Sequence, residues 1–170
     1  MHRRTLLRLG LVGGAALTVA GATALWWSKR APASVAPLNA QARNVLGAWA
    51  LGVLDGALPA DKRVVADMID RHLDRVEAAV AAFSPTTRQE LTQLLAILAN
   101  PLGRRLLVGL AMPWESATVT DLQAGFDAMR RSRLTVRKQA FMALRDLTNA
   151  SFYAEPGTWA TLGYPGPRPL

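Results

Sequence analysis

The chain has 170 residues, no cysteine, two histidines and a formal net charge of +8. The lack of cysteine excludes disulfides, cysteine-ligated zinc and iron–sulfur centres, thiolate nucleophiles and covalently attached haem. Five basic residues near the N-terminus, Arg3, Arg4, Arg8, Lys29 and Arg30, leave 15 basic against 12 acidic residues in the rest, a net charge of only +3. Because that remainder also lacks an RNA-binding aromatic motif and a basic recognition helix, no nucleic-acid role is expected.

Residues 1–33 are predicted to be an export signal or a membrane anchor. An uncharged apolar run from Leu9 to Trp27 lies between a basic start and the small residues Ala31-Pro32-Ala33, which is the layout of a secretory signal. The run is also close to the roughly 20 residues that span a bilayer. Cleavage of the segment and its retention in the inner membrane therefore both stay open.

The start of this segment resembles the twin-arginine (Tat) signal. The residues that carry this resemblance are Arg3, Arg4, Leu6 and Leu7. A Tat signal addresses folded proteins, often with a cofactor or partner already attached, to the Tat translocase. The resemblance implies a periplasmic protein, whose signal can also serve to export a partner.

A helical domain is predicted for residues 39–170, after a linker at 34–38. Helices are expected at about residues 40–55, 60–83, 85–98, 101–107, 120–132 and 134–153. Asn39, Ser84 and Asn100 are predicted N-caps, and proline follows the last two at the first helical position. No stretch alternates β-branched and polar residues, so no strand is expected. The predicted fold is all-α, an irregular bundle of about six helices joined by short connections.

The helix at 60–83 has the clearest periodicity. Its apolar residues share one arc, and its carboxylates fall opposite them at Asp67, Asp70, Asp74 and Glu77. That placement favours a solvated face over an acid–base or metal site. His72 lies within the apolar arc without a second histidine, a cysteine or a carboxylate on its face, which favours a core or interface histidine over a catalytic one.

The remaining residues that could have a chemical role are expected to have a structural one. Trp49 and Trp114 are expected in the core, and the helix at 40–55 is too continuously apolar to lie on the surface. Arg104 and Arg105 are expected to point outward. No glycine-rich phosphate loop follows a strand, so no flavin or nicotinamide site of the Rossmann type is expected, and no catalytic, cofactor-binding or metal-binding residue is assigned.

A basic cluster joins the last two predicted helices. Its members are Arg130, Arg131, Arg133, Arg137 and Lys138. Such a cluster is a solvated surface, a docking site for an acidic partner, or a contact with anionic lipid, and the sequence leaves all three open.

The C-terminal stretch from Phe152 is rich in aromatic residues, glycine and proline. Pro156 is expected to open a short turn that carries Trp159, and Gly163 to end that turn in the left-handed conformation. The residues after it are expected to run extended and to need a docking surface, either on a partner chain or on this protein's own core. The predicted partner interface consists of Tyr153, Trp159, Gly163, Tyr164, Pro165, Gly166 and Pro167.

With this C-terminal stretch, the chain resembles the small, third (gamma) subunit of gluconate 2-dehydrogenase and related membrane-bound FAD-dependent dehydrogenases of the glucose–methanol–choline type. The resemblance covers roughly Leu38 to Pro167. It is carried by the twin-arginine leader and by Leu98-Ala99-Asn100-Pro101, Arg104-Arg105-Leu106, Phe152-Tyr153, Trp159, Gly163-Tyr164 and Gly166-Pro167.

The resemblance implies a non-catalytic subunit without a cofactor of its own. Its partners would be an FAD-dependent large subunit, which it escorts through Tat export and stabilises, and often a multihaem cytochrome c subunit. A free-standing, membrane-anchored helical scaffold or chaperone in the periplasm is the alternative that the sequence leaves open.

Overall fold

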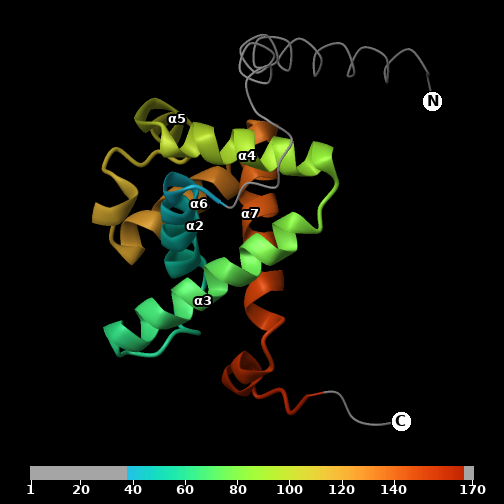
Figure 1. Ribbon diagram of the computed structural model, residues 1–170. Coiled ribbons are helices and arrows are strands. Elements are labelled where there is room, and N and C mark those ends of the chain that lie inside the picture. The colour runs from blue at the N-terminus through green and yellow to red at the C-terminus, as the bar shows by residue number, and fades with distance from the viewer. Residues whose placement is uncertain (1–37, 167–170) are drawn as a thin grey trace, which may run out of the picture. The chain divides into compact units, whose positions relative to one another are not determined.

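The computed structural model describes residues 38–166, which form six α-helices and no strand, as predicted (Figure 1). The α-helices are α2 (Ala40–Val53), α3 (Lys62–Ala81), α4 (Pro85–Ala99), α5 (Pro101–Leu107), α6 (Val119–Arg130) and α7 (Thr135–Tyr153), with short 3₁₀ helices η1 (Trp114–Ser116) and η2 (Pro156–Leu162). The predicted export signal, most of the linker and Pro167 lie outside the described residues. None of the helices between residues 38 and 166 is long and apolar enough to cross a membrane.

The predicted N-caps begin three of the helices. Asn39 Oδ1 accepts a hydrogen bond from the Ala42 amide at 2.8 Å, and Ser84 Oγ accepts one from the Thr87 amide at 3.2 Å. Asn100 ends α4 in an extended conformation and caps α5 through a 2.9 Å bond from the Leu102 amide. Two helices therefore follow one another without a linker, because one residue serves both ends.

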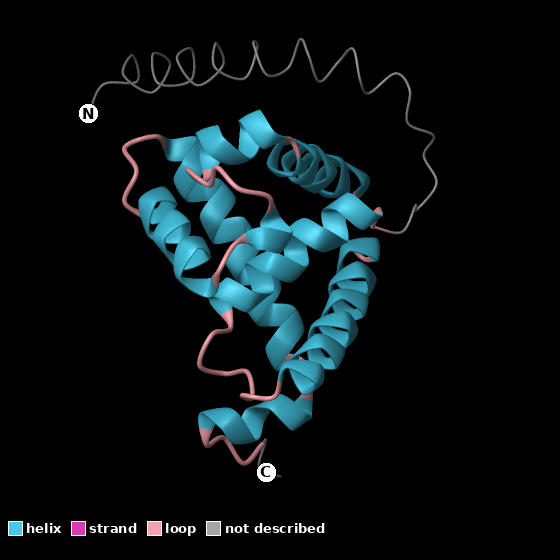
Figure 2. Ribbon diagram, turned by 90° about the vertical axis from the view of Figure 1, so that its left-hand side faces the viewer, coloured by secondary structure: helices cyan, strands magenta, loops and turns pink. Residues whose placement is uncertain are grey.

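The core is built around α2, as its continuous apolar sequence predicts. This helix packs against α3, α4, α6, α7 and η1, and Figure 2 shows the helices of the described chain joined by short loops. Trp49 is fully buried on α2, with ring centroids 4.2 Å from Phe126, 6.3 Å from Phe141 and 6.5 Å from Trp114. The expected core positions of Trp49 and Trp114 are confirmed.

Two glycines allow the helices to approach closely. A Cβ atom on Gly52 of α2 would lie 2.6 Å from Phe126 Cε2 on α6. A Cβ atom on Gly103 of α5 would lie 2.1 Å from the carbonyl oxygen of Ile97 on α4. Any larger residue at either position would push two helices apart.

The orientation of α5 differs from the expectation. Arg104 is buried, with 6% of its surface exposed, whereas Leu102 and Leu106 are each 66% exposed; Arg105 points outward as expected. The prediction for Arg104 was wrong because the Asn100 cap and the contact of Gly103 with α4 set the orientation of this seven-residue helix. Its own pattern of apolar residues is too short to do so.

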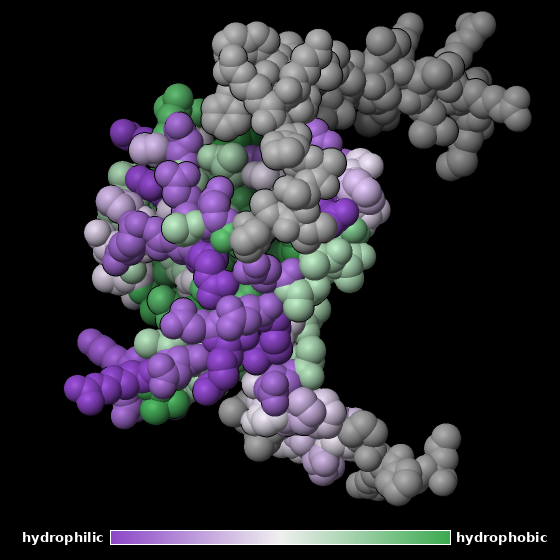
Figure 3. Space-filling model, in the orientation of Figure 1, coloured by the Kyte–Doolittle hydropathy of each residue, from purple (hydrophilic) through white to green (hydrophobic). Residues whose placement is uncertain are grey.

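The acidic residues of α3 lie largely in solvent. Asp67, Asp70 and Asp74 are exposed, and Figure 3 shows hydrophilic side chains gathered over this helix. Glu77 is half-buried, and Arg43 of α2 pairs with it at 3.3 Å and with Asp74 at 3.0 Å. Within residues 38–166 no group of three His, Asp or Glu side chains is placed to hold a metal ion.

The basic cluster between α6 and α7 is partly engaged within the chain. Arg130 and Arg131 each pair with Asp127 at 2.9 Å. Arg137 Nε donates a 2.6 Å hydrogen bond to the carbonyl of Leu107, the last residue of α5. These contacts favour a solvated surface with a local structural role over a free docking site.

Candidate partner interface

The predicted interface residues that the structure describes, from Tyr153 to Gly166, lie at the C-terminal end of α7 and beyond it. Figure 1 shows η2 (red) beyond that end, on the side of the bundle away from α4 and α5. Within the described chain, η2 packs mainly against α7. The segment is therefore attached mainly to one end of α7. Its position depends on a small number of contacts, so the loss of one of them should displace it.

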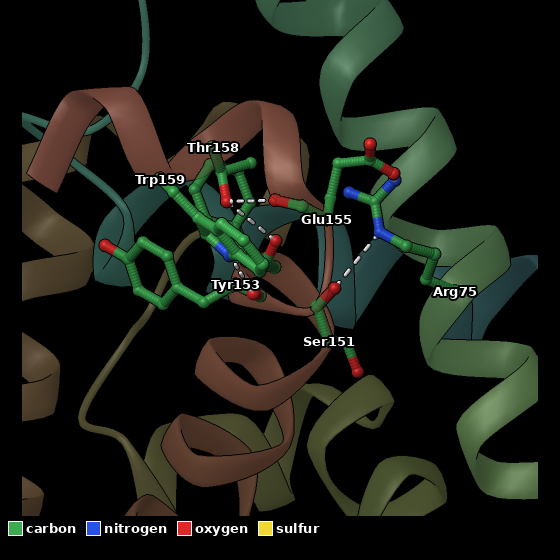
Figure 4. Close-up of polar contacts among 7 residues, drawn as sticks. Arg75, Ser151, Tyr153, Glu155, Thr158 and Trp159 are labelled. Carbon is green, nitrogen blue, oxygen red and sulfur yellow. Dashed lines mark hydrogen bonds and ion pairs between the residues drawn. The ribbon is translucent and has the colours of Figure 1, made fainter. Parts of the chain in front are cut away.

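Two side chains of η2 bind the last turn of α7 (Figure 4). Trp159 Nε1 donates a 2.8 Å hydrogen bond to the Tyr153 carbonyl. Thr158 Oγ1 lies 2.7 Å from the Glu155 carbonyl and 3.2 Å from that of Phe152. The final carbonyls of a helix have no partners within it, so these two side chains satisfy them. The tail thus caps α7.

Glycine shapes the rest of the tail. Gly163 has φ +67°, the left-handed conformation expected for it, and Tyr164 donates its amide to the Trp159 carbonyl at 3.1 Å. Gly166 has φ +98° and is buried, and a Cβ atom there would lie 3.3 Å from Trp159 Cζ3. Gly166 therefore lies against the indole in a conformation that favours glycine, and the extended run expected for this tail stays a prediction.

The two aromatic rings have different surroundings. The ring centroid of Tyr164 lies 5.4 Å from that of Trp159. Trp159 is half-buried, whereas Tyr164 is 47% exposed. Trp159 therefore docks on this protein's own α7, whereas Tyr164 is presented outward, and docking of the tail on a partner chain stays a prediction.

Arg75 of α3 joins the same region and was not identified from the sequence. Its Nε donates a 3.0 Å hydrogen bond to the Ser151 carbonyl, and its guanidinium lies 3.6 Å from the Glu155 carboxylate (Figure 4). Both side chains of the ion pair are partly exposed, so the pair contributes at most about 1 kcal/mol. Its main effect is to hold the start of the tail against α3. Sequence spacing gave no signal for it, because the two residues are far apart in the chain.

His72 lies behind this junction, in the interior expected from its helical position. It is 1% exposed, and its ring meets Phe152 of α7 edge-on at 6.0 Å. Burial, and secondly the charge of Arg75, lower the pKa of His72 to about 4. Its Nδ1 has no hydrogen-bond partner among the described residues. The neutral ring therefore acts as a packing residue between α3 and α7.

Acid should destabilise the protein through His72. The unfolded chain binds this proton below its ordinary pKa of 6.5, whereas the folded chain resists it down to about 4. The free energy of unfolding should therefore fall as the pH drops from 7 to 5, by about 2 kcal/mol from this group. Urea unfolding of the wild type and His72→Gln at both pH values measures the difference, since the variant supplies the contribution of all other groups. Equal pH dependence of the two proteins would contradict the assignment.

The described tail presents a surface for contact. Thr158 and Trp159 bind the last turn of α7, and Tyr164 is a large side chain that the tail exposes, with 47% of its surface accessible. Such an arrangement suits recognition of another protein. No family model, curated protein or solved structure matches this chain.

Proposed function

We propose that this protein is the non-catalytic small subunit of a periplasmic, flavin-dependent sugar or alcohol dehydrogenase complex. It escorts the flavoprotein through Tat export and stabilises it afterwards. The observation that carries the proposal is the C-terminal aromatic segment, where the resemblance to the gamma subunits of gluconate 2-dehydrogenases is most specific. The twin-arginine resemblance at the N-terminus supports the export role.

The build of the tail supports a role in binding. Capping α7 requires Trp159 and Thr158, which make the hydrogen bonds to its last turn. Tyr164 adds none to that turn, yet its amide donates a 3.1 Å hydrogen bond to the Trp159 carbonyl and its ring centroid lies 5.4 Å from that of Trp159. A ring held in place before binding loses little conformational freedom when a partner covers it, and Tyr and Trp dominate the energy of many interfaces.

The helical domain also fits a division of labour between chains. Residues 38–166 contain no strand, and hence no strand followed by a glycine-rich phosphate turn. The flavin would belong to the large subunit, and a multihaem cytochrome c would pass electrons on to the membrane. This chain would supply the export signal and the docking surface.

A free-standing scaffold or chaperone is the second candidate. The observation that favours it is the exposure of Leu102 and Leu106 on α5, a pair of apolar side chains that could bind varied clients. The two candidates differ in the composition of the complex, because a subunit has one partner in a fixed ratio and a chaperone has many.

Affinity purification of the full chain from its native host tests the proposal. We expect one flavoprotein of several times its mass in a fixed ratio. The chain produced alone should be colourless and inactive with sugars and an artificial electron acceptor. Stoichiometric flavin on the isolated chain would show that it is itself a flavoprotein. A mixture of unrelated proteins without flavin would favour the chaperone.

A further inference from the structure

Arg104 lines a cavity on the side of the bundle away from the tail. The cavity has a volume of about 250 Å³ and lies between the first turns of α2, the α4–α5 junction and η1. The polar residues in its wall are Gln41, Asn44, Arg104 and Glu115. It is separate from the proposed partner interface, so it can be tested independently of the proposed function.

No carboxylate of the described residues forms an ion pair with the guanidinium of Arg104. Its Nε is buried without a hydrogen-bond partner within residues 38–166. A buried charge of this kind is strongly unfavourable unless something compensates it. The fold nevertheless turns α5 so that Arg104 is inside and Leu102 and Leu106 are outside. A helix that buries a charged side chain and exposes apolar ones loses stability, and such locally unfavourable arrangements are typical of functional sites.

The acidic residue in the wall is engaged elsewhere. Asn44 Nδ2 donates a hydrogen bond to the Glu115 carboxylate, which holds that carboxylate at the exposed rim of the cavity. Trp114 Nε1 donates a 2.9 Å bond to the Leu98 carbonyl, so the indole is a fixed apolar wall. The cavity thus combines the buried guanidinium of Arg104 with the apolar wall formed by Trp114 and the side-chain amide of Asn44.

We propose that this cavity binds a carboxylate through Arg104. The planar guanidinium pairs with a carboxylate through two parallel hydrogen bonds. The volume is below the roughly 300 Å³ at which pockets for drug-sized ligands begin, which suits a small carboxylic acid or one acidic side chain. A phosphate dianion fits less well, because a single cation faces it and Glu115 would repel its second charge.

The Arg104 Nε–H resonance of the full-length chain, labelled with ¹⁵N-arginine, measures binding directly. Propionate should move this resonance and saturate at a concentration at least about tenfold lower than propionamide, the neutral molecule of the same size, because the ion pair would be lost. Propionate should also change the tryptophan fluorescence of the wild type, and Arg104→Gln should abolish that change. Arg105→Gln, which changes the exposed neighbour, should bind propionate as the wild type does.

Two further probes identify the source of the carboxylate. A blocked tripeptide with a central glutamate that binds more tightly than propionate would assign the cavity to an acidic side chain of a protein. Tighter binding of propionate would assign it to a free acid. Equal binding of propionate and propionamide, or tighter binding of inorganic phosphate, would overturn the proposal.

If Arg104→Gln does not fold, Glu115→Gln provides a second variant with which to test carboxylate binding in the cavity. Removing the negative charge at the rim should strengthen propionate binding about threefold or more, because a like charge is lost. If Glu115 is instead the natural partner of Arg104, the variant would lose stability and the wild type would not bind propionate. Unchanged or weaker binding by the variant overturns the proposal.

Discussion

Trp49→Ala is expected to lower the free energy of unfolding by about 3–5 kcal/mol. Trp49 is fully buried on α2 and contacts the rings of Trp114, Phe126 and Phe141. Its removal leaves a cavity where four segments of the chain meet. Because domains of this size have a total stability of about 5–15 kcal/mol, a large part of the population should unfold. Urea unfolding followed by far-ultraviolet circular dichroism measures the loss.

Two control variants separate packing from other effects. Leu102→Ala removes an exposed side chain of α5 and should change stability by less than about 0.5 kcal/mol. Trp49→Phe should cost clearly less than Trp49→Ala, because it keeps most of the ring and removes an indole N–H that has no partner among the described residues. A loss below about 1 kcal/mol for Trp49→Ala would contradict the central place of α2.

Tyr164→Ala should reduce affinity for the partner flavoprotein by a factor of about 30 or more, which corresponds to roughly 2 kcal/mol. The melting temperature should stay unchanged, because the ring is 47% exposed and makes no hydrogen bond to α7. Trp159→Ala should lower both affinity and stability, since it removes the bond to the Tyr153 carbonyl and the surface on which Gly166 lies. Surface plasmon resonance and calorimetry give the two quantities.

The pair of variants distinguishes the roles of the two rings. Tyr164→Phe is the matched control, and it should retain most of the affinity if the ring area carries the contact. If Tyr164→Ala binds the partner as tightly as the wild type does, the tail serves only to cap α7. Unchanged stability together with unchanged binding in Trp159→Ala would refute both the interface and the cap.

Much of the fold was predictable because helix starts are local. Asn39, Ser84-Pro85 and Asn100-Pro101 each carry their capping chemistry within a few residues, and the structure places helices after all three. The start of α6 at Val119 was predicted one residue late, at Thr120, although Thr118 and Asp121 form a capping box whose spacing was readable. Local signals therefore placed the helices well.

Orientation and site geometry were less predictable, because they depend on contacts between distant segments. Arg104 is inside because Gly103 rests on Ile97, and a seven-residue helix cannot show this by its own pattern. The aromatic tail was identifiable from composition, and the left-handed Gly163 from its place after a turn. The contact of Gly166 with Trp159 and that of Arg75 with Glu155 were not, since each depends on where another element lies.

The escort role is tested most directly by Arg3→Lys combined with Arg4→Lys in the native host. We expect both this protein and the partner flavoprotein to remain in the cytoplasm, because one twin-arginine signal serves two chains. Arg8→Lys, which leaves the arginine pair intact, should export both as the wild type does. Fractionation with immunodetection of each chain gives the answer. Arrival of the flavoprotein in the periplasm while this chain stays behind would contradict the escort role.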